Sequence, residues 1–181
     1  MRLILVFALL LYSGQACSQQ YQTHHGSVSF FAEAPIENIA ATNKNAFAFV
    51  DLSTGEITGQ LTIANFEFKK PLMKTHFNEK YMESKRFPVA DFRGKITGYK
   101  PMGGLTQQLM VKGKLTIHGQ TREVKIPVVI HTTGDRITFS TAFVVMLADY
   151  GIQAPRMFWR NITDDVTVKA DLVFMLPDSM R

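Results

Sequence analysis

The chain has 181 residues, 46% hydrophobic and 19% charged, a balance that excludes a disordered or collagen-like protein and fits one globular domain with a sizeable core. Its net charge of +5 is spread along the chain without a basic run rich in aromatic residues, so nucleic acid is not expected as a partner. One cysteine excludes a disulfide scaffold, a zinc ribbon and a CxxC redox site.

Residues 1–18 have the pattern of a secretory signal peptide: one positive charge at Arg2, an apolar run over 3–12, then small or polar residues. The apolar run would rise only about 15 Å as a helix, too short to cross a bilayer. We therefore predict cleavage after Ser18, a binding domain over 19–181, and a periplasmic or secreted protein. Lipid anchoring through Cys17 is the less favoured alternative, because Gln15 and Gly14 replace the small and aliphatic residues it needs. No later segment has eighteen consecutive apolar residues, so the chain is not expected to span a membrane.

After the signal peptide, apolar and polar residues alternate almost throughout, the period-two pattern of half-buried strands. Residues 111–117 give the clearest case, with valine, leucine and isoleucine on one face and two lysines and a threonine on the other. A turn at Gly119-Gln120 and another at Ser53–Gly55 join neighbouring strands directly, which favours antiparallel pairing. Pro127 cannot donate to a ladder and predicts an edge, a bulge or an outward gap. The expected strands cover 25–32, 45–51, 56–68, 89–98, 105–118, 122–131, 136–146 and 162–176.

One helix interrupts the strands. Met73, Phe77 and Tyr81 recur at every fourth residue, Pro71 opens the segment and Pro88 stops it. The apolar stripe is too narrow for a fully buried helix, so we expect it to lie across the sheet and help close one end.

Eight long antiparallel strands predict an all-β barrel, since closure removes the exposed edges of the sheet. A barrel of this size is filled by its own side chains or holds one small ligand, and an apolar interior suits a hydrocarbon. Phe47 is a candidate ligand-binding residue whose face is ambiguous, because Ala46 and Ala48 beside it are apolar too. The candidates on inward positions are Leu61, Ile63, Phe92, Ile96, Gly113, Leu115, Ile117, Val124, Ile126, Phe139, Phe143, Val168, Leu172 and Phe174.

The loop 155–160 adds Phe158 and Trp159 as candidates, because it carries large apolar residues between two arginines. It would form either a portal, with the arginines available for an anionic headgroup, or a plug or dimer contact.

Motifs of catalysis are missing from the chain: we find no HExxH, GxSxG, GxxxxGK[ST] or GxGxxG. Adjacent His24 and His25 would point to opposite faces of a strand, and His118 lies on the outward parity beside a turn, so these histidines are expected to be solvated or at strand ends. We expect neither an enzyme, nor a metal site, nor a cofactor.

Three stretches resemble a known family. They are 76–88 with the following Ala90-Asp91-Phe92, the hairpin 111–121 with its Leu-Thr-Ile-His-Gly core, and Asp149-Tyr150-Gly151-Ile152. In order and spacing they are similar to the YceI-like, lipocalin-like lipid-binding proteins over about 24–176. Leu147 departs from the family, which often has a basic residue at that place.

This resemblance implies an eight-stranded lipocalin-like barrel with one short helix, exported to the periplasm. It also implies a long apolar lumen for a polyisoprenoid or similar chain, without catalysis, and a homodimer as one assembly state. Two hypotheses follow: a carrier, store or sequestering protein for a polyisoprenoid, quinone-like or fatty-acyl lipid, or a filled barrel that acts as a structural or protein-interaction module. Alternation alone does not separate them, because an apolar lumen and an apolar core produce the same pattern.

Overall fold

The structure is a computed structural model, and it describes residues 20–34, 37–100, 104–133, 136–153 and 165–175, without the side chains of His24 and His25. The predicted signal peptide, Cys17, and the loop with Phe158 and Trp159 lie outside the described residues.

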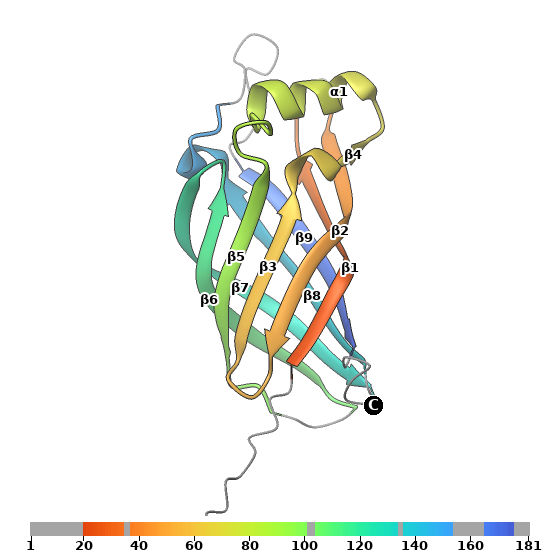
Figure 1. The fold of residues 1–181 in the computed structure, drawn as a ribbon, viewed down its shortest axis with the longest axis vertical. Helices are drawn as coiled ribbons and strands as arrows, with labels where there is room; N and C mark the ends of the chain where they lie inside the picture. The colour runs from red at the N-terminus through yellow and green to blue at the C-terminus, as the bar shows by residue number, and fades with distance from the viewer. Residues whose placement is uncertain (1–19, 35–36, 101–103, 134–135, 154–164, 176–181) are drawn as a thin grey trace, which may run out of the picture.

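The described strands form a closed antiparallel barrel capped by a short helix (Figure 1). In spatial order the sheet runs β1-β9-β8-β7-β6-β5-β3-β2, and β1 also pairs with β2, which closes the ring. The eight long strands are β1 (Gln20–Ala32), β2 (Ile39–Asp51), β3 (Glu56–Thr62), β5 (Val89–Thr97), β6 (Thr106–Ile117), β7 (Gln120–Thr133), β8 (Arg136–Met146) and β9 (Asp165–Met175). The all-β, eight-stranded architecture predicted from the sequence is confirmed.

The third predicted strand is broken. The structure has β3 (Glu56–Thr62), then a 3₁₀ turn η1 (Ile63–Asn65), then the two-residue β4 (Glu67–Phe68), which pairs with the beginning of β2. Asn43 of β2 is fully buried and lies between the part of β2 that pairs with β4 and the part that pairs with β3. Its amide Nδ2 donates to the Thr62 carbonyl oxygen at 2.9 Å and its Oδ1 accepts from the Asn45 N–H at 2.9 Å. One side chain thus satisfies backbone groups at the point where the strand breaks.

The helical segment is built in two parts, α1 (Pro71–His76) and a π-helical turn η2 (Phe77–Tyr81). The Met82 N–H donates to the Phe77 carbonyl at 2.9 Å, the five-residue spacing of a π-helix. The segment lies across one end of the barrel, at the top in Figure 1, as the sequence predicts.

The hairpin between β6 and β7 turns one residue earlier than predicted. Ile117 pairs with Gln120, so the turn residues are His118 and Gly119, with φ of 51° and 72°. Two positive φ angles are what a tight two-residue hairpin turn requires. The His118 ring is largely buried rather than solvated: it packs edge-on against Phe87, centroids 4.4 Å apart, and its Nδ1 lies 3.2 Å from the carbonyl oxygen of Tyr150. Tyr150 belongs to η3 (Leu147–Tyr150), so this contact ties the hairpin to the end of β8.

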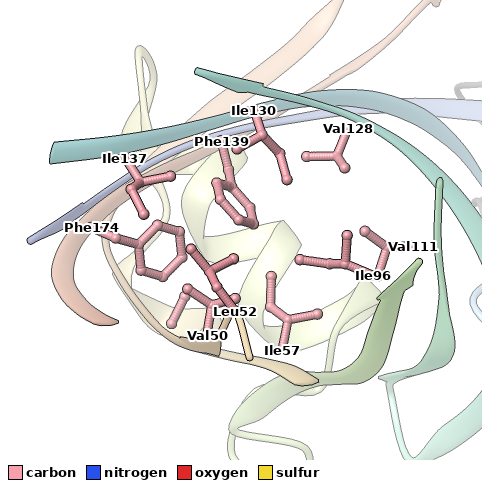
Figure 2. Close-up of a cluster of buried hydrophobic side chains, with 11 residues drawn as sticks. Val50, Leu52, Ile57, Ile96, Val111, Val128, Ile130, Ile137, Phe139 and Phe174 are labelled. Carbon is pink, nitrogen blue, oxygen red and sulfur yellow. The ribbon is translucent and has the colours of Figure 1, made fainter. Parts of the chain in front are cut away.

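Two clusters of buried side chains fill the ends of the barrel. The far-end cluster lies away from the helix and includes Val50, Ile57, Ile130, Phe139 and Phe174 (Figure 2). Phe139 and Phe174 pack edge to face there, with ring centroids 4.9 Å apart. The helix-end cluster lies beneath the helix and η3, and its buried members are Ile63, Met82, Leu115, Val145, Tyr150 and Ile152.

Candidate ligand-binding site

The barrel interior holds a cavity of about 320 Å³. Inward side chains of the barrel strands form most of its wall, and these are nearly all alanine, valine, isoleucine, leucine and phenylalanine. Packed protein interiors contain few voids larger than a water molecule, so this space is distinct from a filled core. Its volume lies near the lower end of the range found for small-molecule sites, roughly 300–1,000 Å³.

The helical segment forms the roof of the cavity with Met73, His76, Phe77 and Tyr81. Phe77 stacks on Phe30 of β1 with centroids 5.4 Å apart, and lies 5.6 Å from Phe66 and 5.0 Å from Phe68. Offset and edge-on aromatic pairs of this kind add attraction beyond the burial of area. The roof is therefore held onto the barrel mainly by one aromatic cluster.

Polar groups near the cavity are few. The helical segment contributes His76 and Tyr81, and the strands contribute Thr58, Gln60, Asp91 and Thr141. Burial raises the pKa of the Tyr81 phenol above its usual value, so this group is an uncharged hydrogen-bond donor at neutral pH. In the described part of the chain, no three His, Cys, Asp or Glu residues lie close enough together to hold a metal ion.

Gly59 of β3 leaves open space at the cavity wall. An added Cβ there would meet nothing closer than 3.9 Å, which leaves room on the inner face. Around this glycine the cavity lining also includes Phe47, Gln60 and Asp91, which are partners in register on β2, β3 and β5 and carry the parity opposite to the inward residues. Phe47 thus borders the cavity from the face of β2 opposite to that of its buried neighbours Ala46 and Ala48.

A family model for the YceI-like domain matches residues 19–174. The chain belongs to the YceI-like family. The roof, the lumen and the wall around Gly59 are therefore parts of a YceI-like barrel.

Solved structures share the fold at low sequence identity. A polyisoprenoid-binding domain from Saccharophagus degradans has a TM-score of 0.76 and 14% identity, covering 88% of this chain and 99% of that one. BcnA of Burkholderia cenocepacia has a TM-score of 0.68 and 22% identity, covering 82% and 95%. The YceI protein of Campylobacter jejuni has a TM-score of 0.66 and 15% identity, covering 81% and 90%. Among curated proteins, none matches the chain significantly.

Most of the candidate residues named from the sequence line the lumen of this YceI-like barrel. Phe47 borders the cavity from the opposite parity, and ten candidates line it from inward positions: Leu61, Ile63, Phe92, Leu115, Ile117, Ile126, Phe139, Phe143, Val168 and Leu172. Whether they contact a ligand stays a prediction.

Four candidates lie outside the lining. Ile96 and Phe174 are buried in the far-end cluster, where side chains fill the barrel. Val124 packs against the helix-end cluster. Parity correctly places these residues inside, but it carries no information on how far along the barrel the cavity extends.

Gly113, the fourth, has a different role from the one expected. It pairs directly with Gly94 of β5, and an added Cβ would meet the Arg93 carbonyl oxygen, the Gly94 Cα at 2.6 Å and the Phe92 ring at 2.8 Å. The same ring atom would lie 2.6 Å from a Cβ at Gly94. The two glycines therefore let the Phe92 ring lie flat against the sheet, and no cavity adjoins Gly113 into which a larger side chain could extend.

Sequence reasoning missed the lining residues of β1, of η1–β4 and of the roof, among them Val28, Phe30, Phe66, Phe68, Met73 and Phe77. The four-residue spacing of Met73, Phe77 and Tyr81 already placed a helix across the barrel, so these side chains could have been included. Phe66 and Phe68 carried no such signal, because they lie beyond the break in the third strand.

Proposed function

We propose that this YceI-like barrel binds one apolar chain, a polyisoprenoid, quinone-like or fatty-acyl lipid, in its lumen without catalysis. The observation that supports this most is the cavity of about 320 Å³, with its apolar wall and aromatic roof. Its structural likeness to a polyisoprenoid-binding domain supports the same ligand class.

The energetics of such a site need few polar contacts. Each methylene group moved from water into the lumen contributes about 0.8 kcal/mol, so the binding energy grows with chain length. His76 and Tyr81 at the roof offer the polar contacts that would orient one end of the chain. The role is transport, storage or sequestration of that lipid, in the periplasm if residues 1–18 are the signal peptide that their pattern predicts.

The alternative is a filled barrel that acts as a structural or protein-interaction module. The far-end cluster is packed as that hypothesis requires, but the middle of the barrel is not. The cavity therefore favours the binding protein.

Filling the lumen tests the proposal. Gly59→Leu should project its side chain into the cavity, since nothing lies within 3.9 Å of the new Cβ. Because the backbone there has no positive φ, we expect the barrel to fold and the affinity for a fluorescent isoprenoid or fatty acid to fall about tenfold or more.

Glu56→Leu is the matched control, since it adds the same side chain on an exposed position of the same strand and should leave affinity unchanged. Thermal unfolding of all three proteins shows whether each is folded. A wild-type protein that binds neither probe, and from which native mass spectrometry releases no lipid, would overturn the proposal.

A further inference from the structure

Strands β7 and β8 are neighbours in the barrel but pair along only part of their length. The β7–β8 ladder has five pairs, from Thr133↔Arg136 to Val129↔Ser140. On either side the neighbouring ladders continue to the ends of the same strands, at Ile117↔Gln120 and Met146↔Asp165. Among the described residues, 120–128 of β7 and 141–146 of β8 therefore have no backbone pairing with each other.

Pro127 explains where the ladder stops. Proline has no N–H to donate, and the hydroxyl of Thr141 donates instead to the Pro127 carbonyl oxygen at 2.5 Å. Beyond this point the described residues of the two strands share no ladder pair, and the contact of His118 Nδ1 with the Tyr150 carbonyl, at 3.2 Å, joins β7's hairpin to η3. We call the unpaired stretch between 120–128 and 141–146 the slit; at about 3.3 Å per residue it is about 17 Å long.

The slit lies between the lumen and the outer surface. Val128 and Thr141 line the lumen, and the same two residues line a hollow on the outside of the barrel. The other residues that line this hollow are Thr97, Gln108, Leu109, Met110, Pro127, Val129, Ser140 and Ala142. Val128 and Thr141 thus stand between the apolar interior and the surface at the closed end of the slit, directly after the last ladder pair, Val129↔Ser140.

The outer surface along the β8 edge of the slit is apolar, whereas Thr121, Glu123 and Lys125 are exposed on the β7 edge. Val144 is 56% exposed, Met110 42%, Met146 41% and Val129 39%. Val144 and Met146 lie on the β8 edge of the slit, and Val129 stands at its closed end. Large apolar side chains gathered around an opening mark an interaction site more often than isolated exposed ones do.

A row of lysines adjoins the β7 edge. Lys125 of β7 pairs with Lys112 of β6, which pairs with Lys95 of β5, and all three are exposed. Arg93 and Lys114 form a second pair of like charges, while Glu56 lies opposite Lys95 and Glu123 opposite Lys114, so the rows carry a net positive charge with one acidic residue at an end of each. Like charges directly opposite each other destabilise a sheet, and the ion pairs found in the described part of the chain do not involve this row. An anionic partner would offset that repulsion.

We propose that this face docks on an anionic lipid bilayer, and that the slit is the side door through which an apolar chain passes between bilayer and lumen. The lysine row would bind the headgroups, while Val144 and Met146 would contact the acyl region beneath them. The side-door role rests on the proposed function, whereas the docking does not require a ligand in the lumen.

Flotation with vesicles tests the docking. Wild-type protein should bind vesicles of phosphatidylcholine with phosphatidylglycerol, bind pure phosphatidylcholine weakly, and bind the anionic vesicles more weakly at high salt, where only the apolar contacts remain. A lysine near an anionic surface contributes about fivefold in affinity, so Lys112→Gln with Lys125→Gln should lower the partition coefficient about 20-fold. Lys44→Gln with Lys80→Gln removes the same charge from exposed positions elsewhere and should cost far less.

The apolar edge is tested separately. Val144→Ser with Met146→Ser should reduce vesicle binding further at high salt, where the electrostatic part is screened. If these side chains instead join two copies of the chain, sedimentation would show a dimer that this variant dissociates, and vesicle binding would be unaffected; that result overturns the proposal. Equal vesicle binding by the lysine-row variant and its control overturns it too.

A staple tests the door. Glu123→Cys and Met146→Cys lie on facing edges of the slit, and in a Cys17→Ser background a short bis-maleimide would join them. The staple should slow transfer of a fluorescent isoprenoid from vesicles at least tenfold, while each single-cysteine variant treated with reagent keeps the wild-type rate. If the cross-linked protein takes up the probe at an unchanged rate, the slit is not the entry route and this part of the proposal is wrong. If unstapled protein takes up no probe even from ethanol dilution, the proposed function fails, and flotation still decides the docking.

Discussion

At the scale of single residues, Tyr150 makes the stability of the folded chain depend on pH in the alkaline range. Its side chain is buried, and burial raises the pKa of its phenol above the usual value of 10.0; Asp149 raises it further and Arg122 lowers it. Above about pH 10 the unfolded chain therefore loses this proton before the folded chain does. Stability is fully present below that pH and is lost as pH rises toward the folded-state pKa.

Tyr150→Phe should accordingly flatten the alkaline loss of stability. Urea midpoints of wild type and variant, measured between about pH 8 and pH 11, should converge as pH rises, because the variant has one fewer group that ionises on unfolding. Tyr21 and Tyr81, whose pKa values burial also raises, keep part of the dependence. Parallel curves for the two proteins would contradict this account.

Residues also show what the sequence could not predict. Gly59 and Gly113 share inward parity, yet one faces open space and the other the backbone of β5. The difference arises from cross-strand register, which brings Gly113 opposite Gly94 and is not encoded in either strand alone. The sequence also offered no reason to single out Asn43. Its role is to hydrogen-bond two backbone groups, of Thr62 and Asn45, that the folded chain brings to its side chain.

At the scale of elements, the sequence predicts strands and helix better than their interruptions. Period two locates all eight long strands, and the four-residue stripe locates the roof. The break at Ile63–Asn65 and the π-helical turn are set by tertiary contacts: β4 pairs with β2, and the turn carries Phe77 into the aromatic cluster. Neither leaves a periodic signal in its own residues.

Phe77→Ala tests the roof as an element. The ring is half-buried, so we expect a loss of about 2 kcal/mol in unfolding free energy, below the 3–5 kcal/mol typical of a fully buried phenylalanine. Removing it should also loosen the roof, so a bound chain probe should dissociate several-fold faster. Phe31→Ala, an exposed neighbour on β1, is the control and should change neither quantity appreciably. Loss of stability without faster dissociation would mean that the roof does not restrain the ligand.

At the scale of the whole molecule, the barrel is uneven in how its strands are held. The far end has a packed core, although β1 is irregular there in its pairing with β9 and β2, while the helix end has a cavity, a roof held by aromatic contacts and the slit. The alternation in the sequence predicted a closed barrel, and Pro127 predicted an edge, a bulge or an outward gap; the structure has a gap in one ladder there. The sequence could not show that the unpaired stretch lies beside the lumen, because its position depends on which strand neighbours β7 in the folded barrel.

Hydrogen exchange measures this unevenness directly. In an antiparallel sheet the N–H groups of a strand point alternately to its two neighbours, so every second amide between 121 and 128 of β7 should face the slit and exchange quickly. Amides of the same strand that face β6 should be protected, and β6, with ladders to β5 and β7 over 110–116, serves as the internal control. Residue-resolved exchange by NMR should show the alternation on β7 and none on that part of β6. Uniform protection along β7 would mean that the slit is closed in solution, and the chain would then have to enter the lumen beneath the roof.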